Sequence, residues 1–295
     1  MEAETILDRS FKIFGDEEFT CLGRVLQQNT SILTELRLDN ILFGEKGMTA
    51  LGVGLEHNTT VTKIDLSHNA IGAFGATVLG SVLQSNATLT ELNLDCNGIG
   101  NEGATALAIA LQHNTTLLDM DLSSNHIGDQ GATALGVALQ HNSTLAALTL
   151  FDNNIGEEGA KALGVALQYN TALQHLNLFL TNMGSIGKTA FEVALLRNTT
   201  IRRLILPEDS SSISCCIAKN KELYSYQYWS THLHVGFNMT PCHQIIMTTL
   251  LCNRSTSNYP ALPDHVWYLI FSFLQRKKLL ELGSNPNIMR STWVE

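Results

Sequence analysis

The sequence predicts an α/β solenoid, a curved horseshoe with parallel strands on its concave face and helices on its convex face. Three observations predict it: a period of 28 residues, an alternating apolar pattern early in each period, and a helical apolar spacing later in it. A fixed period of this length is typical of solenoids, because one unit cannot bury its apolar face alone and stacks on its neighbours.

The period is carried by apolar residues that recur at equal steps, each preceded three places earlier by an asparagine. The apolar residues are Val61, Leu89, Leu117, Leu145, Leu173 and Ile201, and the asparagines are Asn58, Asn86, Asn114, Asn142, Asn170 and Asn198. We therefore expect the same local structure in each unit.

The first part of each unit predicts a short strand. In the unit 114–141, Met120 and Leu122 alternate with Asp119, Asp121 and Ser123. Alternation of apolar and polar residues is typical of a strand with one buried face.

The second part of each unit predicts a helix over 131–140, because Ala132, Leu135 and Leu139 form an apolar stripe at helical spacing. We expect Asn142 to end this helix in the left-handed conformation. Strands joined by helices must run parallel. Strands pack about 4.8 Å apart and helices about 8–10 Å apart, so the stack bends with the strands inside.

A second set of asparagines follows the strands, at the turn of each central unit. Its members are Asn69, Asn97, Asn125 and Asn153. A side-chain amide at a buried turn satisfies backbone groups that would otherwise lack partners. We expect a structural ladder of stacked amides and no chemistry from these residues.

The complete motif is L-x-x-L-x-L-x-x-N-x-I-G followed by G-A-x-A-L-x-x-x-L, repeated in register from 61–69, 89–97, 117–125 and 145–153. It resembles the leucine-rich repeat, specifically the 28-residue class typified by ribonuclease inhibitor and the C-terminal regions of NOD-like receptors. The resemblance covers roughly residues 20–206 and departs at Ile41, Thr181 and Pro207. It implies a non-enzymatic protein-binding scaffold that inhibits or regulates its partner by covering an active or binding site. The regular, isolated array also resembles effector proteins that bacteria deliver into host cells.

The pattern divides the chain into three parts: a helical N-terminal cap at 1–28, about seven repeats at 29–207, and a helical C-terminal cap or small domain at 208–295. Segment 262–274 is similar to the opening of an F-box, the module that docks a ubiquitin-ligase adaptor. The alternative function is therefore a substrate-recognition subunit of a ubiquitin ligase. A buried amphipathic helix explains the same residues.

Composition and charge bound the partners. A net charge of −9 argues against nucleic acid, because phosphate binding relies on clustered Lys and Arg. We expect no membrane span, because the most apolar run, 266–274, is about half the length of one. Residues 1–15 lack the pattern of a secretory signal, and the scattered cysteines suit free thiols, so we expect a cytoplasmic protein, in the host cytosol if it is a delivered effector.

Enzyme and metal motifs are missing from the sequence, so we expect no enzymatic activity, no metal and no cofactor. The nearest metal candidates lack the paired spacing of structural zinc sites. They are Cys215, Cys216, His232, His234, Cys242, His243 and Cys252.

The function is expected on the outward strand positions. These are Glu35, Arg37, Asp39; Lys63, Asp65, Ser67; Glu91, Asn93, Asp95; Asp119, Asp121, Ser123; Ala147, Thr149, Phe151; His175, Asn177 and Phe179. All except Ser67, Ser123 and Ala147 are candidate protein-binding residues.

Two features stand out on this surface: an acidic field in the early units, around Asp65, Glu91 and Asp119, and a pair of rings, Phe151 and Phe179, in the later ones. They favour a protein partner with a basic or neutral contact surface, bound by a chain that is monomeric when free. In the alternative arrangement the C-terminal segment folds back over both rings.

Overall fold

The computed structural model describes residues 5–10, 15–41, 44–207, 217 and 220, and within them strands and helices alternate along the chain. The strands are β1 Ile6–Asp8, β2 Glu35–Arg37, β3 Lys63–Asp65, β4 Glu91–Asn93, β5 Asp119–Asp121, β6 Ala147–Thr149, β7 His175–Asn177 and β8 Arg203–Ile205. The helices are α1 Asp16–Gln27, α2 Glu45–Glu56, α3 Gly72–Ser85, α4 Gly100–Leu111, α5 Asp129–His141, α6 Glu157–Leu167 and α7 Gly184–Leu195.

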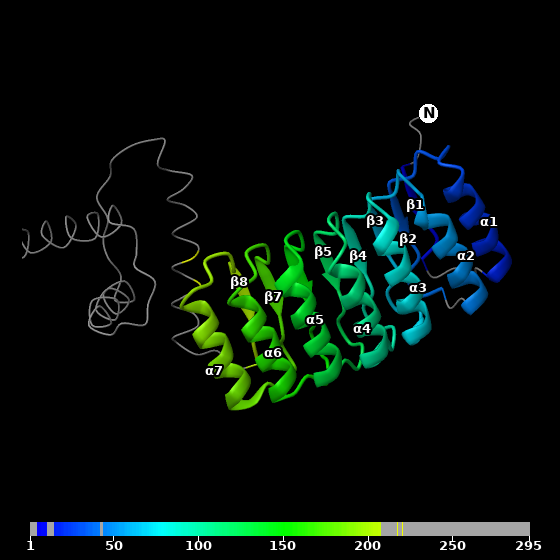
Figure 1. Cartoon of the computed structure of the whole chain (residues 1–295). Helices are drawn as coiled ribbons and strands as arrows, with labels where there is room; N and C mark the ends of the chain where they lie inside the picture. The colour runs from blue at the N-terminus through cyan, green and yellow to red at the C-terminus, as the bar shows by residue number, and fades with distance from the viewer. Residues whose placement is uncertain (1–4, 11–14, 42–43, 208–216, 218–219, 221–295) are drawn as a thin grey trace, which may run out of the picture. The chain divides into compact units, whose positions relative to one another are not determined.

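The strands form one open parallel sheet in chain order, from β1 to β8. Each pair is in register by one repeat, so that Leu92 of β4 lies opposite Met120 of β5, which lies opposite Leu148 of β6. Figure 1 shows the helices in a row along one side of the array and the strands along the other. The α/β solenoid predicted from the period is confirmed.

The core lies between these two layers and runs continuously through the described units. In the unit of β5 and α5 it contains Met120 and Leu122 from the strand side and Leu135 and Leu139 from the helix, all fully buried. Each layer of side chains packs on the next, which is how a unit with a small apolar face is stabilised.

The N-terminal segment contains a strand as well as the predicted helix. β1 pairs in parallel with β2, with Leu7 opposite Leu36, and α1 then packs beside α2 as the other helices pack beside their successors. Leu7 lies 29 residues before Leu36, one residue out of step with the 28-residue period, so the repeat pattern missed this strand.

Of the helical region expected at 208–295, the structure describes Ile217 and Asn220; both are helical, and Asn220 Nδ2 donates to the carbonyl oxygens of Asn198 and Ile201. The F-box-like segment 262–274 and the seven metal candidates lie outside the described residues.

The predicted ladder of turn asparagines is present and buried. The side chain of Asn125 has no exposed surface; its Nδ2 donates to the carbonyl oxygens of Leu94 (2.8 Å) and Ser123 (2.7 Å). Its Oδ1 accepts from the backbone N–H groups of Asn97 (3.0 Å) and Ile99 (3.3 Å). Each amide thus joins its own turn to the turn of the preceding unit.

The asparagines that follow the helices form a second ladder, and the predicted left-handed conformation is wrong for Asn142. Asn142 is extended (φ −79°, ψ 127°), and its Oδ1 accepts from the backbone N–H groups of Thr144 (3.0 Å) and Leu145 (2.7 Å). Its Nδ2 donates to the carbonyl oxygen of Leu111 in the previous unit at 2.8 Å. These bonds require an extended backbone. Asn29, which follows α1, is left-handed (φ 52°). There the next apolar residue of the period, Leu33, comes four places later instead of three.

Side chains from the preceding unit cap the N-termini of α2, α5 and α6. Oδ1 of Asp129 accepts from the backbone N–H groups of Gly156 (2.7 Å) and Gly159 (2.8 Å) at the start of α6. Ala73 occupies the equivalent position before α4 and offers no acceptor. There Gly100 adopts φ +63°, and its N–H donates to the carbonyl oxygen of Asn125 at 2.9 Å. Glycine tolerates this left-handed conformation at little cost, so the loop adapts to the missing cap.

Replacing Asn125 by Ala removes the four side-chain hydrogen bonds of one ladder step and leaves buried backbone groups without partners. We expect the free energy of unfolding to fall by about 2–4 kcal/mol. Denaturant titration measures the change.

The matched control is Asn154→Ala, because Asn154 is the exposed neighbour of the ladder residue Asn153. We expect its effect to stay within about 0.5 kcal/mol. Equal losses in the two variants would contradict the structural role of the ladder.

Candidate protein-binding surface

The outward side chains of the sheet form three parallel columns, which together we call the sheet face. Strand register sets the first two columns, and the 28-residue period sets the third, just past the strand ends. The first column is Glu35, Lys63, Glu91, Asp119, Ala147, His175 and Arg203; the second is Arg37, Asp65, Asn93, Asp121, Thr149, Asn177 and Ile205; the third is Asp39, Ser67, Asp95, Ser123, Phe151 and Phe179.

Hydrogen bonds from the backbone of the third column hold four second-column side chains in place: Asp65, Asn93, Asp121 and Asn177. Oδ1 of Asp121 accepts from the backbone N–H of Ser123 at 2.9 Å, and Asn177 accepts from the N–H of Phe179 at 3.0 Å. These short side chains have few rotatable bonds, so the contacts orient them firmly. The turn therefore presents the third-column side chains in a fixed direction.

At the N-terminal end of the face, acidic and basic side chains neutralise one another in part. Arg37 Nε lies 2.6 Å from Glu35 Oε1 on β2, and Lys63 Nζ lies 2.7 Å from Glu91 Oε1 across β3 and β4. Hydrogen bonding and charge attraction from these glutamates raise the pKa of each cation. Asp39 accepts a hydrogen bond from the hydroxyl of Ser10.

The aspartates of β5 form the centre of the acidic field. Burial raises the pKa of Asp119, and Glu91 and Asp121 raise it further. Burial also raises the pKa of Asp121, hydrogen bonds from Ser123 oppose the increase, and Asp95 and Asp65 add to it. Both carboxylates are therefore less stable as anions here than in water, which marks a surface suited to a cationic partner.

Asp95 contributes a further incompletely satisfied carboxylate to this field. Its Oδ1 is buried and has no hydrogen-bond partner, while its Oδ2 lies 3.6 Å from Nε2 of the exposed His68. A buried acceptor without a donor is costly. The acidic field thus contains a carboxylate that is only partly satisfied within the described residues.

The two phenylalanines predicted to lie side by side do so. The ring centroids of Phe151 and Phe179 are 6.2 Å apart, and the ring planes differ by 18°, a stacked arrangement. Phe179 is 43% exposed and Phe151 is half-buried, and Leu180, next along the turn, is 54% exposed. The segment predicted in the alternative arrangement to cover the rings lies outside the described residues.

The structure extends the sheet face by one strand beyond the candidates identified from the sequence. β8 places the exposed Arg203 opposite His175 and the half-buried Ile205 opposite Asn177. The sequence signal was present, because Ile201, Leu204 and Leu206 repeat the apolar spacing of the other strands. Pro207 interrupts the motif just after this strand, so the strand was not counted among the candidates.

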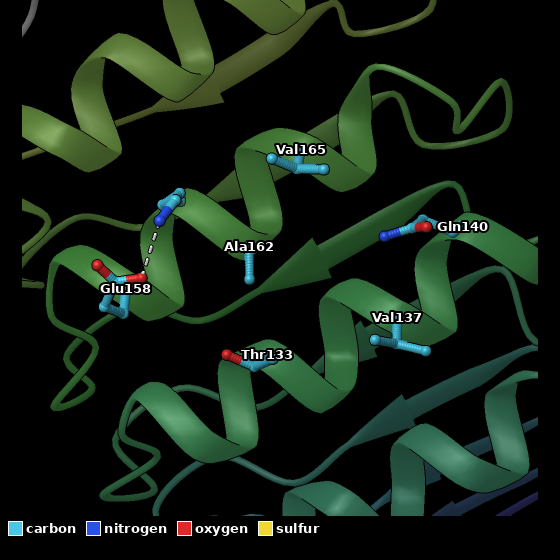
Figure 2. A pocket seen from close by; sticks show the side chains of 7 residues that line it. Thr133, Val137, Gln140, Glu158, Ala162 and Val165 are labelled. Carbon is cyan, nitrogen blue, oxygen red and sulfur yellow. Dashed lines mark hydrogen bonds and ion pairs between the residues drawn. The ribbon is translucent and has the colours of Figure 1, made fainter.

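The helix side offers a hollow between α5 and α6, shown in Figure 2. Its walls include Val137, Ala162 and Val165, and its two charged side chains, Glu158 and Lys161, pair with each other at 3.1 Å. Within the described ranges, no three His, Cys, Asp or Glu side chains group as a metal site.

An open parallel sheet of 28-residue strand–helix units with buried turn asparagines defines an α/β leucine-rich-repeat solenoid. A family model described as leucine-rich repeat matches four tandem segments, 57–80, 85–108, 113–136 and 141–164. The chain therefore contains leucine-rich repeats. None of the helices in the described part of the chain is long and apolar enough to cross a membrane.

Two solved structures are similar to part of the chain. One, the actin-binding site 2 of leiomodin-1, has 22% sequence identity and a TM-score of 0.48, covering 52% of this chain and 92% of that one. The other, the C-terminal domain of tropomodulin from Caenorhabditis elegans, has 16% identity and a TM-score of 0.47, covering 52% of this chain and 98% of that one. A search of curated protein sequences gave no match.

Replacing Asp121 by Asn keeps the oxygen that accepts from Ser123 and removes the charge repelled by Asp95 and Asp65. Because the folded pKa of Asp121 is raised, the folded state binds its proton more readily, and stability falls as pH rises through that pKa. We expect Asp121→Asn to raise the free energy of unfolding at neutral pH by about 0.5 kcal/mol, a value reduced for partial solvent exposure.

Denaturant titrations at neutral pH and at a pH that protonates the aspartates check this prediction. The gain should vanish at the acidic pH, where the native carboxyl is also uncharged. The control is Asp152→Asn on the neighbouring exposed turn, expected to change stability by less than about 0.3 kcal/mol. Destabilisation by Asp121→Asn at neutral pH would contradict the repulsion.

Proposed function

We propose that this protein is a non-enzymatic binding scaffold whose sheet face holds a protein partner. The observation that carries the proposal is the exposed stacked pair Phe151 and Phe179 directly beside the acidic field. Contact with the partner occludes an active or binding site on it, and the scaffold is a monomer in the cytoplasm when free.

The aromatic pair is suited to anchor a partner because it exposes apolar surface that folding does not require. The buried residue of this turn is Leu178, between Asn177 and Phe179, so the core is complete without the rings. Interface hot spots are typically aromatic side chains surrounded by polar groups. Asn177 and His175 supply such groups beside Phe179.

The acidic field is suited to orient the partner and to speed its approach. Asp119 and Asp121 lie next to each other on β5 with no cation within ion-pair distance among the described residues. A basic patch on the partner relieves this repulsion on binding, and complementary charge raises the association rate. The partner therefore has basic character where it meets β4 and β5.

The strand–helix unit and its 28-residue spacing support placing the repeats in the class that resembles ribonuclease inhibitor and NOD-like receptors. Free exposed thiols at Cys21 and Cys96 are compatible with a reducing compartment. The regular, isolated array of repeats is also the basis for proposing that the protein is an effector delivered into a host cytosol.

Replacing both Phe151 and Phe179 by Ala removes the proposed anchor without altering the core. Partners captured by the tagged full-length protein are identified by mass spectrometry and then titrated against each variant. We expect the double variant to bind about 10- to 100-fold more weakly, as is typical for loss of aromatic hot spots.

The matched control replaces Val137 and Val165 by Ala, because both are exposed apolar side chains on the helix side. Affinity should stay within about twofold for this variant. If the affinity of the Phe151→Ala, Phe179→Ala variant also stayed within twofold of the native affinity, the proposed aromatic anchor would be contradicted.

Salt tests the acidic part of the proposal separately. Raising the ionic strength from about 0.05 to about 0.5 M should weaken binding severalfold, because exposed charges are screened. The double variant Asp119→Asn, Asp121→Asn should bind more weakly at low salt and respond less to added salt. An affinity that does not change with salt would remove the steering role.

A further inference from the structure

The last described strand reverses the charge of the sheet face. Arg203 on β8 is exposed and lies opposite His175 on β7, so the C-terminal end of the first column is cationic where its centre is acidic. Within the described residues neither Arg203 nor His175 makes an ion pair. The acidic centre of this column at Asp119 and its cationic C-terminal end are thus both available to charges on a partner.

A short side chain lies between the acidic centre of the column and its cationic end. Ala147 on β6 lies between Asp119 on β5 and His175 on β7 in the register of the sheet. Two strand spacings, about 9.6 Å, therefore separate the strands that carry Asp119 and His175. A longer charged residue at position 147 would bridge the acidic and the cationic groups, whereas Ala147 leaves an uncharged gap between them.

The aromatic pair lies on the same strands as the change of charge. Phe151 follows β6 and Phe179 follows β7, so the rings project from the third column beside the uncharged gap in the first. Ile205 and Asn177 continue the second column past the rings. In strand order the face is acidic, then aromatic, then cationic.

We propose that the sheet face binds a bipolar polypeptide segment of its partner. Basic side chains lie over β4 and β5, an apolar side chain lies on Phe151 and Phe179, and a carboxylate meets His175 and Arg203. This inference rests on the proposed function and narrows it, because a uniformly basic partner would be repelled at β8.

The spacing of the charges sets the length of such a segment. Three strand spacings, about 14 Å, separate the strands of Asp119 and Arg203. An extended chain covers this distance in about four residues at roughly 3.4 Å per residue. The basic and acidic groups of the segment are therefore about four residues apart, with the apolar group between them.

Blocked synthetic peptides test the order directly on the full-length protein. The ordered probe has lysines at one end, tryptophan in the centre and glutamates at the other end. The scrambled probe has the same composition with alternating charges and a terminal tryptophan. In fluorescence titrations we expect the ordered probe to bind about 10-fold more tightly, since its charges and its ring engage together.

Charge reversal at the cationic end gives the decisive comparison. Arg203→Glu should weaken the ordered probe about 3- to 10-fold and strengthen a probe in which lysines replace the glutamates. Arg197→Glu is the matched control, because Arg197 is exposed just after α7 and its replacement makes the same change in net charge. It should leave both affinities within about twofold.

The outcomes separate this inference from the proposed function. Equal binding of the ordered and scrambled probes, equal effects of Arg203→Glu and Arg197→Glu, or no binding of the ordered probe would overturn the bipolar segment. If the order does not matter but the Phe151→Ala, Phe179→Ala variant still loses both probes, the sheet face remains the binding surface. If the ordered probe binds that variant as well as it binds the native protein, the aromatic anchor of the proposed function is wrong.

Discussion

The buried turn amides are the interaction on which the rest of the structure depends. Each solenoid turn leaves backbone N–H and carbonyl groups away from water, and a single asparagine side chain pairs with them in two successive units. Because three of the four bonds of Asn125 reach the preceding repeat, the amide also fixes the register of adjacent strands. A shift by one residue would turn apolar side chains outward and break the ladder at once. The three columns of the sheet face exist because this pairing allows one register.

Irregularities in the sequence are absorbed on the helix side of each unit. Where Asp129 caps the next helix, Gly156 is extended; where Ala73 cannot, Gly100 becomes left-handed and bonds to the backbone instead. The strands keep the same register in both cases. Glycine at these loops therefore isolates the sheet face from variation at the helix ends.

The parts of the structure that repeat were predictable from the sequence, and those that occur once were not. Six copies of one pattern made the strand of Asp119–Asp121 and the ladder of Asn125 clear, because chance does not preserve spacing over many units. Asn142 was misassigned, since residue preference suggests a left-handed cap but the partners of its amide lie in another unit. β1 and Arg203 were missed at the two ends, where the motif has a neighbour on one side only. The stacking of Phe151 on Phe179 followed from strand spacing alone, whereas the raised pKa values of Asp119 and Asp121 required the burial that only the folded chain shows.

The equivalence of the ladder steps has an evolutionary consequence. Because Leu94 and Leu122 accept the same bond from successive units, a whole repeat is a unit that gene duplication or unequal crossing-over can add or remove without a new fold. Loss of the unit 114–141 would bring the strand of Ala147 against β4, one strand spacing (about 4.8 Å) nearer to Glu91. The distance between the charged and the aromatic groups therefore changes in whole strand spacings. A lineage of such proteins would change partners by copying repeats as well as by point substitution.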